Sequence, residues 1–148
     1  MTKSQHGVSL FLDGFLCSQA VLATYGPEHG LNRDLALKLG TGFGGGMGRQ
    51  GQICGAVTGG VMVIGLIKGA ISAEDIASRE KTYTYVKELF NRFYEQNGST
   101  LCRELLNCDL GNPEEYQRAK EQKLFQTLCP EYVKNAIDIL DDILNIKP

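Results

Sequence analysis

Apolar residues recur at intervals of three and four positions along most of the chain, which is the spacing of amphipathic helices. In the N-terminal part this pattern predicts one helix from Val8 to Tyr25, ended by Gly26. A short helix from Arg33 to Leu39 should follow, because Asn32 is a good N-cap residue and Gly40 a good stop. No segment alternates with a period of two, so the sequence predicts an all-α fold.

The segment from Cys54 to Lys68 is apolar, and we expect a buried helix there, although its β-branched residues would also suit a strand. Ser72 begins the capping pattern Ser-Ala-Glu-Asp, which predicts a long helix from this point to about Gln96. Three further helices are predicted: one around Cys102, one from Pro113 to about Lys123, and one that begins at Cys129-Pro130. The expected architecture is a single-domain bundle of six or seven helices with a long glycine-rich loop.

The composition is that of an ordinary globular domain. The chain has 148 residues, of which 43% are hydrophobic and 22% charged, so residues 1–148 are expected to form one domain. Lys and Arg number 15 against 17 Asp and Glu, and the formal net charge is −2. Because nucleic-acid-binding proteins carry a basic surplus, this balance excludes nucleic acid as a partner.

Two apolar runs bear on targeting, and both are short. Val8–Leu12 is interrupted by Asp13, whereas a signal peptide has about 7 to 15 apolar residues in a row. Ile53–Ile67 spans 15 residues, whereas a membrane span needs about 20. We therefore expect a cytoplasmic protein with no membrane partner, whose cysteines stay reduced and serve catalysis or metal binding rather than structural disulfides.

A glycine-rich loop is predicted from Thr41 to Gln52, in a chain that contains 18 glycines. Its Gly46-x-Gly48-x-x-Gly51 matches the dinucleotide fingerprint, but helix-like sequence precedes it where the fingerprint requires a strand. The loop could instead allow close backbone packing, or its N–H groups could hold an anion such as a thiolate or a sulfide. The glycines expected to contact a bound group are Gly44, Gly45, Gly46, Gly48 and Gly55.

Five widely spaced cysteines carry the most informative chemistry. Cys54, Cys102 and Cys129 lie in the first turns of predicted helices, where the helix dipole and free N–H groups favour a thiolate. Cys17 falls in the middle of the first predicted helix, and Cys108 falls at the end of a short one. A single cysteine is often only a small buried hydrophobic residue, and we favour that interpretation for Cys108.

The spacing of the cysteines argues against zinc. Structural zinc sites usually supply ligands in close pairs such as Cys-x-x-Cys, and this chain has none. His6 and His29 belong to no ligand motif. An iron–sulfur cluster is compatible with dispersed cysteines, because a fold can gather four thiolates from distant segments.

Five segments stand out together: Cys17-Ser-Gln-Ala-Val, Gly42-Phe-Gly-Gly-Gly-Met-Gly, Cys54-Gly-Ala-Val-Thr-Gly-Gly, Cys102 with Glu-Leu-Leu behind it, and Cys129. With them the chain resembles the C_GCAxxG_C_C family of redox-active proteins over roughly residues 8 to 140. The family pattern carries over onto four cysteines and leaves Cys108 as an addition. A similar domain of split-Soret cytochromes is associated with an iron–sulfur centre, so the resemblance implies such a centre here. Covalent haem is not expected, because Cys-x-x-Cys-His is absent.

The first of three functional hypotheses is a redox protein. It would use four converging cysteines as redox-active or metal-binding residues: Cys17, Cys54, Cys102 and Cys129. They would hold an iron–sulfur cluster or act as a reversible dithiol, and they would exchange electrons with a redox partner protein. We expect Cys54 to be the principal reactive residue, because it follows a loop rich in N–H groups and begins an apolar helix.

Two other hypotheses leave the cysteines incidental. One is a helical module that binds an anion or a nucleotide with the glycine-rich loop, and the other is a structural protein that acts through assembly. Gly55-x-x-x-Gly59 and Gly65-x-x-x-Gly69 would let a neighbouring helix approach closely. That neighbour could belong to the same chain or to the second copy in a homodimer.

Overall fold

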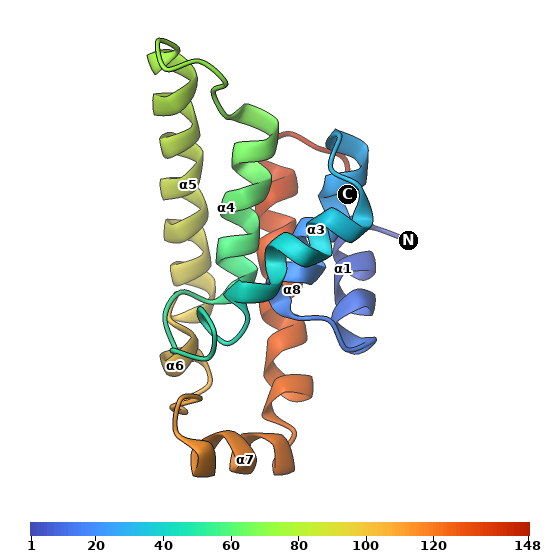
Figure 1. Ribbon diagram of the computed structural model, residues 1–148, viewed down its shortest axis with the longest axis vertical. Coiled ribbons are helices and arrows are strands. Elements are labelled where there is room, and N and C mark those ends of the chain that lie inside the picture. Colours follow the sequence, from blue (N-terminus) through green and yellow to red (C-terminus); the bar gives the residue numbers. More distant parts are fainter.

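The computed structural model describes all 148 residues, and its fold is all-α, as predicted (Figure 1). The helices are α1 (Lys3–Leu12), α2 (Cys17–Tyr25), η1 (Gly26–His29), α3 (Arg33–Gly40), η2 (Thr41–Phe43), α4 (Gly55–Lys68), α5 (Ile76–Asn97), α6 (Cys102–Leu105), α7 (Pro113–Glu121) and α8 (Leu124–Ile143), of which η1 and η2 are 3₁₀ helices. The only β-type contact is an isolated bridge between Ile53 and Leu101. None of the helices combines the length and the apolar composition that crossing a membrane requires.

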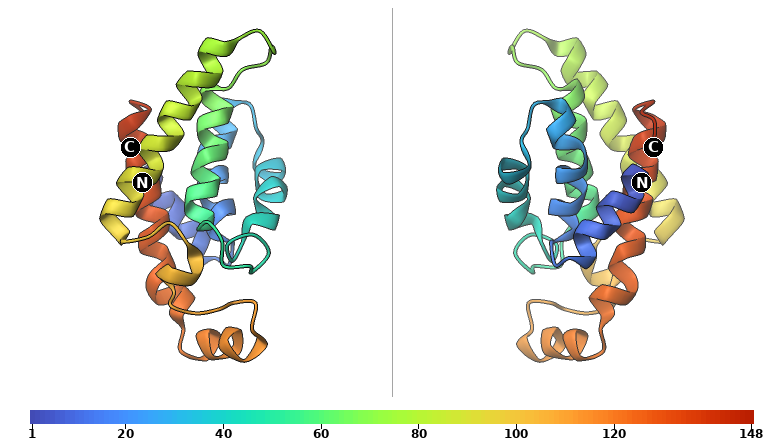
Figure 2. Two further views of the ribbon diagram at one scale, coloured as in Figure 1. Left: turned by 90° about the vertical axis from the view of Figure 1, so that its left-hand side faces the viewer. Right: turned by 90° about the vertical axis from the view of Figure 1, so that its right-hand side faces the viewer.

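Helices α4, α5 and α8 run side by side along the long axis of the molecule, and α2 packs against α4 and α8 (Figures 1 and 2). Helix α1 lies on α8 and α2, and α3 covers α2. The interior between these helices is filled by large side chains with almost no exposed surface: Tyr25, Phe93, Leu22, Ile64, Leu89, Ile137 and Leu140. A second, smaller apolar cluster lies where α6 and α7 meet α8, and it contains Cys102 and Cys129.

The most extensive helix contact is between α2 and α4, and two glycines of α4 make it possible. A β-carbon added to Gly55 would stand 3.0 Å from the Ser18 backbone nitrogen, and one added to Gly59 would stand 2.9 Å from the Ser18 carbonyl oxygen. Ser18 is fully buried, and its hydroxyl donates to the carbonyl of Gly40 at 2.6 Å, which fixes α2 against its other neighbours. The first glycine pair thus packs within the chain, whereas Gly65 faces open space.

The helix predicted from Val8 to Tyr25 is in fact two helices. Helix α1 ends at Leu12 and α2 begins at Cys17. Between them Gly14 has a φ of 110°, which lies in the left-handed region and interrupts the helix. The prediction was wrong because the apolar residues keep their helical spacing across Gly14, although the backbone conformation of Gly14 ends the helix. Cys17 is consequently the first residue of α2 and does not lie in mid-helix, and the total is eight α-helices rather than six or seven.

The predicted start of the long helix is also wrong. Helix α5 begins at Ile76 rather than at Ser72. The Asp75 carboxylate accepts the Ser78 backbone N–H at 3.0 Å, so this side chain rather than the earlier serine caps the helix.

The last helix begins earlier than predicted. Helix α8 starts at Leu124, so Cys129 lies in its second turn and not at its start. Pro130 stands inside the helix, where its missing N–H leaves the carbonyl of Gln126 without a helical donor. Proline favours the first turn of a helix, which is why the sequence predicts a start at Pro130. Here the packing of α8 against α1 and α5 stabilises a helix that continues on both sides of the proline.

Replacing Gly59 with alanine should destabilise the fold through the α2–α4 contact. The added methyl group would stand 2.9 Å from the Ser18 carbonyl oxygen and 3.0 Å from the Val21 β-carbon. We expect the free energy of unfolding to fall by about 1–3 kcal/mol, as in other overpacked interiors. Urea unfolding followed by circular dichroism measures the change.

Gly65→Ala is the matched control on the same helix, because nothing lies within 4 Å of its added carbon. This variant should be neutral or gain up to about 1 kcal/mol from its higher helix propensity. Equal stabilities of the two variants would contradict the packing role of Gly59.

Candidate functional site

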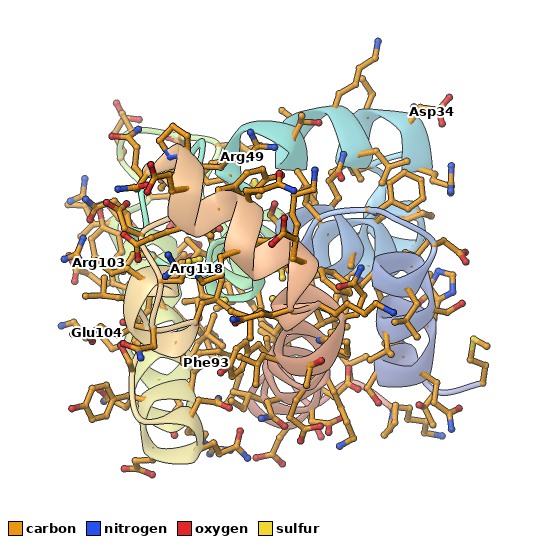
Figure 3. All side chains as sticks on the ribbon, turned by 90° about the horizontal axis from the view of Figure 1, so that it is seen from below. Asp34, Arg49, Phe93, Arg103, Glu104 and Arg118 are labelled. Atoms are coloured by element: carbon orange, nitrogen blue, oxygen red, sulfur yellow. The ribbon has the colours of Figure 1, made fainter.

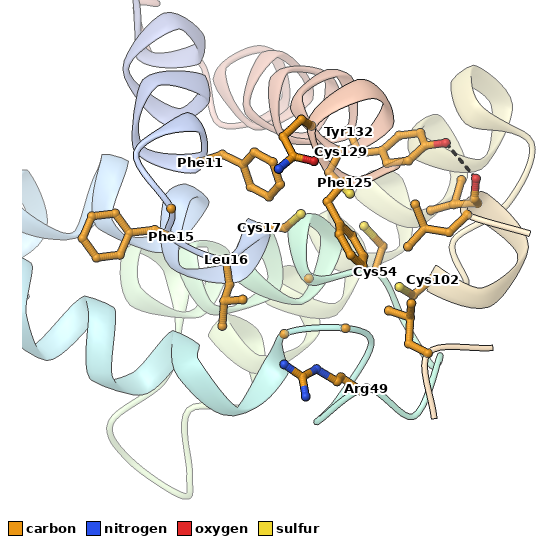
Figure 4. A pocket seen from close by; sticks show the side chains of 18 of the residues that line it. Phe11, Phe15, Leu16, Cys17, Arg49, Cys54, Cys102, Phe125, Cys129 and Tyr132 are labelled. Carbon is orange, nitrogen blue, oxygen red and sulfur yellow. Dashed lines mark hydrogen bonds between the residues drawn. The ribbon is translucent and has the colours of Figure 1, made fainter. Parts of the chain in front are cut away.

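One pocket, of about 500 Å³, gathers four of the five cysteines. Cys17 comes from the start of α2, Cys54 from the residue before α4, Cys102 from the start of α6 and Cys129 from the second turn of α8. Figure 4 shows the sulfur atoms of Cys17, Cys54 and Cys129 directed toward one another, with Cys102 farther along the wall. All five cysteines are free thiols in this structure.

A short backbone pairing holds the segments of Cys54 and Cys102 side by side. The Cys54 N–H donates to the Thr100 carbonyl at 2.8 Å, and the Cys102 N–H donates to the Gln52 carbonyl at 2.7 Å. Gly46 is buried behind this pairing, where an added β-carbon would stand 2.9 Å from the Cys102 β-carbon. Together with the α2–α4 contact, these bonds bring the starts of α2, α4 and α6 to one place.

The Cys17 and Cys54 side chains form the electrostatic centre of the pocket. Interactions with the sulfur atoms of Cys129 and Cys54, and then burial, raise the pKa of Cys17 well above its ordinary value. The Cys17 thiol, and then the N–H groups of Ala56 and Val57, lower the pKa of Cys54 against the opposing effect of burial. The Cys54 side chain does not cap α4 with a hydrogen bond of standard geometry. The N–H groups act instead through the positive end of the helix dipole, which favours an anion. The pocket therefore favours the thiolate form at Cys54 and the protonated form at Cys17.

Cys102 and Cys108 differ from this pair. Burial, followed by the neighbouring Cys54 and Cys129, raises the pKa of Cys102 to about 12, so its side chain is a neutral thiol near pH 7. Cys108 does not line the pocket, and its sulfur lies 3.5 Å from the Glu115 carbonyl oxygen. Burial also raises the pKa of Cys108. The structure thus separates Cys108 from the other four cysteines.

The glycine-rich segment borders the pocket, but most of its N–H groups are used within the segment itself. Seven of them donate to backbone carbonyls of residues 41–47: those of Gly44, Met47, Gly48, Arg49, Gln50, Gly51 and Gln52. Positive φ values at Gly45 and Gly46 and at the residues after them fold the chain into these turns. The expectation of a loop rich in free N–H groups is therefore wrong, because the segment satisfies its own donors.

The nucleotide-binding alternative lacks the strand that the dinucleotide fingerprint requires. Helix α3 precedes the glycine-rich segment, so Gly46-x-Gly48-x-x-Gly51 does not follow a strand. Four of the five glycines expected to contact a bound group do line the pocket: Gly44, Gly45, Gly48 and Gly55. The fifth, Gly46, packs behind Cys102.

The apolar wall of the pocket was missed by the sequence analysis. Phe11 and Phe15 reach it from the corner between α1 and α2, and Phe125 and Tyr132 reach it from α8 (Figure 4). Their spacing in the sequence is also that of ordinary core residues, so nothing marked them as pocket residues. The thiols therefore stand in a cavity whose walls are mainly aromatic and aliphatic.

Arg49 is the second residue that sequence reasoning missed. Its guanidinium donates to the Tyr116 hydroxyl at 2.8 Å and lies 4.1 Å from the centre of that ring. It forms no ion pair, so no carboxylate neutralises its charge at the pocket. Figure 3 shows it with Arg103 and Arg118 at the end of the molecule that carries α6 and α7. Its one signal in the sequence was that it is the only charged residue of the glycine-rich segment.

The donor set of the pocket is unusual in containing thiols alone. No group of three or more His, Cys, Asp or Glu side chains is placed so that it could hold a single metal ion. The pocket wall contains four cysteines and no His, Asp or Glu. Four thiolates are the usual ligands of an iron–sulfur cluster, and a [4Fe–4S] cluster takes one at each iron and so spreads its ligands.

The family model C_GCAxxG_C_C, described as "Putative redox-active protein", matches residues 15–143. The chain belongs to this family. The match begins just before α2 and spans all five cysteines, including the four of the pocket. No curated protein and no solved structure matches the chain. The central motif in the family's name is Gly-Cys-Ala-x-x-Gly. This chain has Cys54-Gly55-Ala56 at the corresponding place, so Gly and Cys are exchanged, and Gly59 matches the final glycine.

Iodoacetamide should alkylate Cys54 before the other pocket cysteines, because the thiolate is the reactive form of cysteine. The rate at Cys54 should fall as the pH is lowered through its pKa, while Cys17 and Cys102 react slowly until the pH is high. Peptide mass spectrometry identifies the modified residue at each time point.

Cys54→Ser should remove the fastest phase of this reaction, and Cys108→Ser should leave it intact. First modification at Cys102, or loss of the fast phase in Cys108→Ser, would show that the thiolate has been assigned to the wrong residue.

Proposed function

We propose that this protein is a thiol–disulfide redox protein in which Cys54 and Cys17 form the working pair. The observation that carries the proposal is the contact between a thiolate-favouring cysteine at a helix N-terminus and a neighbouring cysteine that stays protonated. Gly55 lets the two cysteines approach each other. A β-carbon at position 55 would stand only 3.2 Å from the β-carbon of Cys17.

The two cysteines have complementary roles. The Cys54 thiolate is the nucleophile that attacks an oxidant, and the Cys17 thiol then supplies the second sulfur. Oxidation removes two electrons from the pair, releases the Cys17 proton and joins the two sulfurs. Reduction by a dithiol reverses these changes.

A second candidate is an iron–sulfur protein, which the all-thiol pocket favours. Cys17, Cys54, Cys102 and Cys129 would be its ligands, and the cluster would supply one-electron transfer. The helix N-termini at Cys17, Cys54 and Cys102 would stabilise the negative charge of the ligands, and the apolar wall would exclude water. This function needs Cys102, whereas the dithiol function does not.

A redox partner and a compartment belong to the proposal. The disulfide must be reduced again in each cycle, so the proposed partner is a dithiol reductant. A reducing cytoplasmic compartment would suit a pair that is oxidised only transiently.

Equilibration in buffers of reduced and oxidised glutathione, followed by counting of free thiols, tests the dithiol function. The wild-type protein should lose two of its five thiols in one two-electron transition. Cys17→Ser and Cys54→Ser should abolish the transition, and Cys108→Ser should keep it. Retention of the transition in Cys54→Ser would contradict the proposal.

Anaerobic purification with measurement of iron and acid-labile sulfide distinguishes the second candidate. Iron and sulfide in equal amounts, lost in Cys102→Ser, would assign the pocket to a cluster. The dithiol function instead predicts that Cys102→Ser retains the glutathione-dependent transition and that the purified protein lacks sulfide.

A further inference from the structure

Access to the working sulfurs limits what can oxidise them. Only 4% of the Cys54 residue surface is exposed and Cys17 is half-buried, and both side chains line the pocket. A disulfide on another folded protein would have to enter this cavity to meet the thiolate. A small molecule can enter it, so the oxidant that the pocket suits is small.

The walls limit the chemical class of that molecule. Most of the lining is apolar and includes Phe11, Phe15 and Phe125, whereas Arg49 and Gln126 are polar groups at the wall. Such a cavity binds an apolar body, and its few polar groups can hold the polar end of that body. The pair is a two-electron donor, so the oxidant must accept two electrons.

We propose that the pocket binds an organic hydroperoxide, which Cys54 reduces with Cys17 as the resolving thiol. This proposal rests on the dithiol function and names its oxidant. The juxtaposition that supports it is the Cys54 sulfur at the N-terminus of α4, the Cys17 sulfur directed toward it, and a mainly apolar chamber of about 500 Å³ in front of them.

The reaction balances with the groups in the pocket. The Cys54 thiolate attacks the terminal oxygen of the hydroperoxide, the O–O bond breaks, and Cys54 becomes a sulfenic acid. The departing alkoxide takes the Cys17 proton and leaves as an alcohol. The Cys17 thiolate then attacks the Cys54 sulfur and expels hydroxide, which takes a proton from solvent to give water. A small dithiol returns the disulfide to two thiols.

Stopped-flow oxidation of the reduced protein by cumene hydroperoxide and by hydrogen peroxide tests the inference, with diamide as a general thiol oxidant. We expect the rate constant for cumene hydroperoxide to exceed that for hydrogen peroxide by more than about tenfold, a selectivity that an apolar pocket can supply. Cys17→Ser should form the sulfenic acid but no disulfide.

Leu16→Glu tests the contribution of the apolar pocket separately from the reactivity of the thiols. Leu16 lines the pocket and is 36% exposed, so a carboxylate is tolerated there but disfavours an apolar ligand. The ratio of the two peroxide rate constants should fall toward one in this variant. Leu39→Glu is the control, because Leu39 is 56% exposed on α3 and does not line the pocket.

The outcomes separate the two proposals. If diamide forms the disulfide but cumene hydroperoxide reacts no faster than hydrogen peroxide, the inference about the oxidant is wrong and the dithiol function stands. Faster oxidation by a benzoquinone than by cumene hydroperoxide would overturn it in favour of a quinone. If no oxidant forms the disulfide, the dithiol function itself is wrong.

Discussion

The close contact between α2 and α4 is the constraint on which the pocket depends. Side chains at Gly55 and Gly59 would collide with the backbone of Ser18, and α2 would have to move away by at least a few tenths of an ångström. Cys17 is the residue before Ser18, so any such movement would carry its sulfur away from Cys54. Gly59, which matches the final glycine of the family's motif, is thus explained by packing, because it lies where the helices that follow Cys17 and Cys54 nearly touch.

Burial and ionisation oppose each other at the centre of this contact. A buried thiolate is disfavoured by desolvation, and at Cys102 that effect dominates and keeps the side chain neutral. At Cys54 the neighbouring Cys17 thiol and the N–H groups at the start of α4 outweigh it and lower the pKa. The pocket therefore favours negative charge on one sulfur beside a second sulfur that keeps its proton. This asymmetry between two adjacent cysteines is what distinguishes the site from a cluster of buried small residues.

Local signals in the sequence predicted the local structure well. Asn32 caps α3 as expected, with its side chain 2.9 Å from the Leu35 N–H, and the all-α class followed from apolar spacing. The features that the sequence did not predict depend on tertiary packing or on the backbone conformation of a single residue. Gly14 breaks a continuous apolar pattern, and Pro130 is held inside a helix that its own preference would end. The grouping of the cysteines came from the family resemblance, whereas the position of Cys17 at a helix start became visible only in the structure.

Disulfide mapping after oxidation tests the central claim most directly. Reduced protein would be treated with one equivalent of diamide, separated as a monomer and digested without reduction, and its cross-linked peptides would be identified by mass spectrometry. The account predicts an intramolecular disulfide between Cys17 and Cys54, which contact each other in the reduced protein. A disulfide that includes Cys108, or one that joins two molecules while Cys17 and Cys54 stay free, would contradict it.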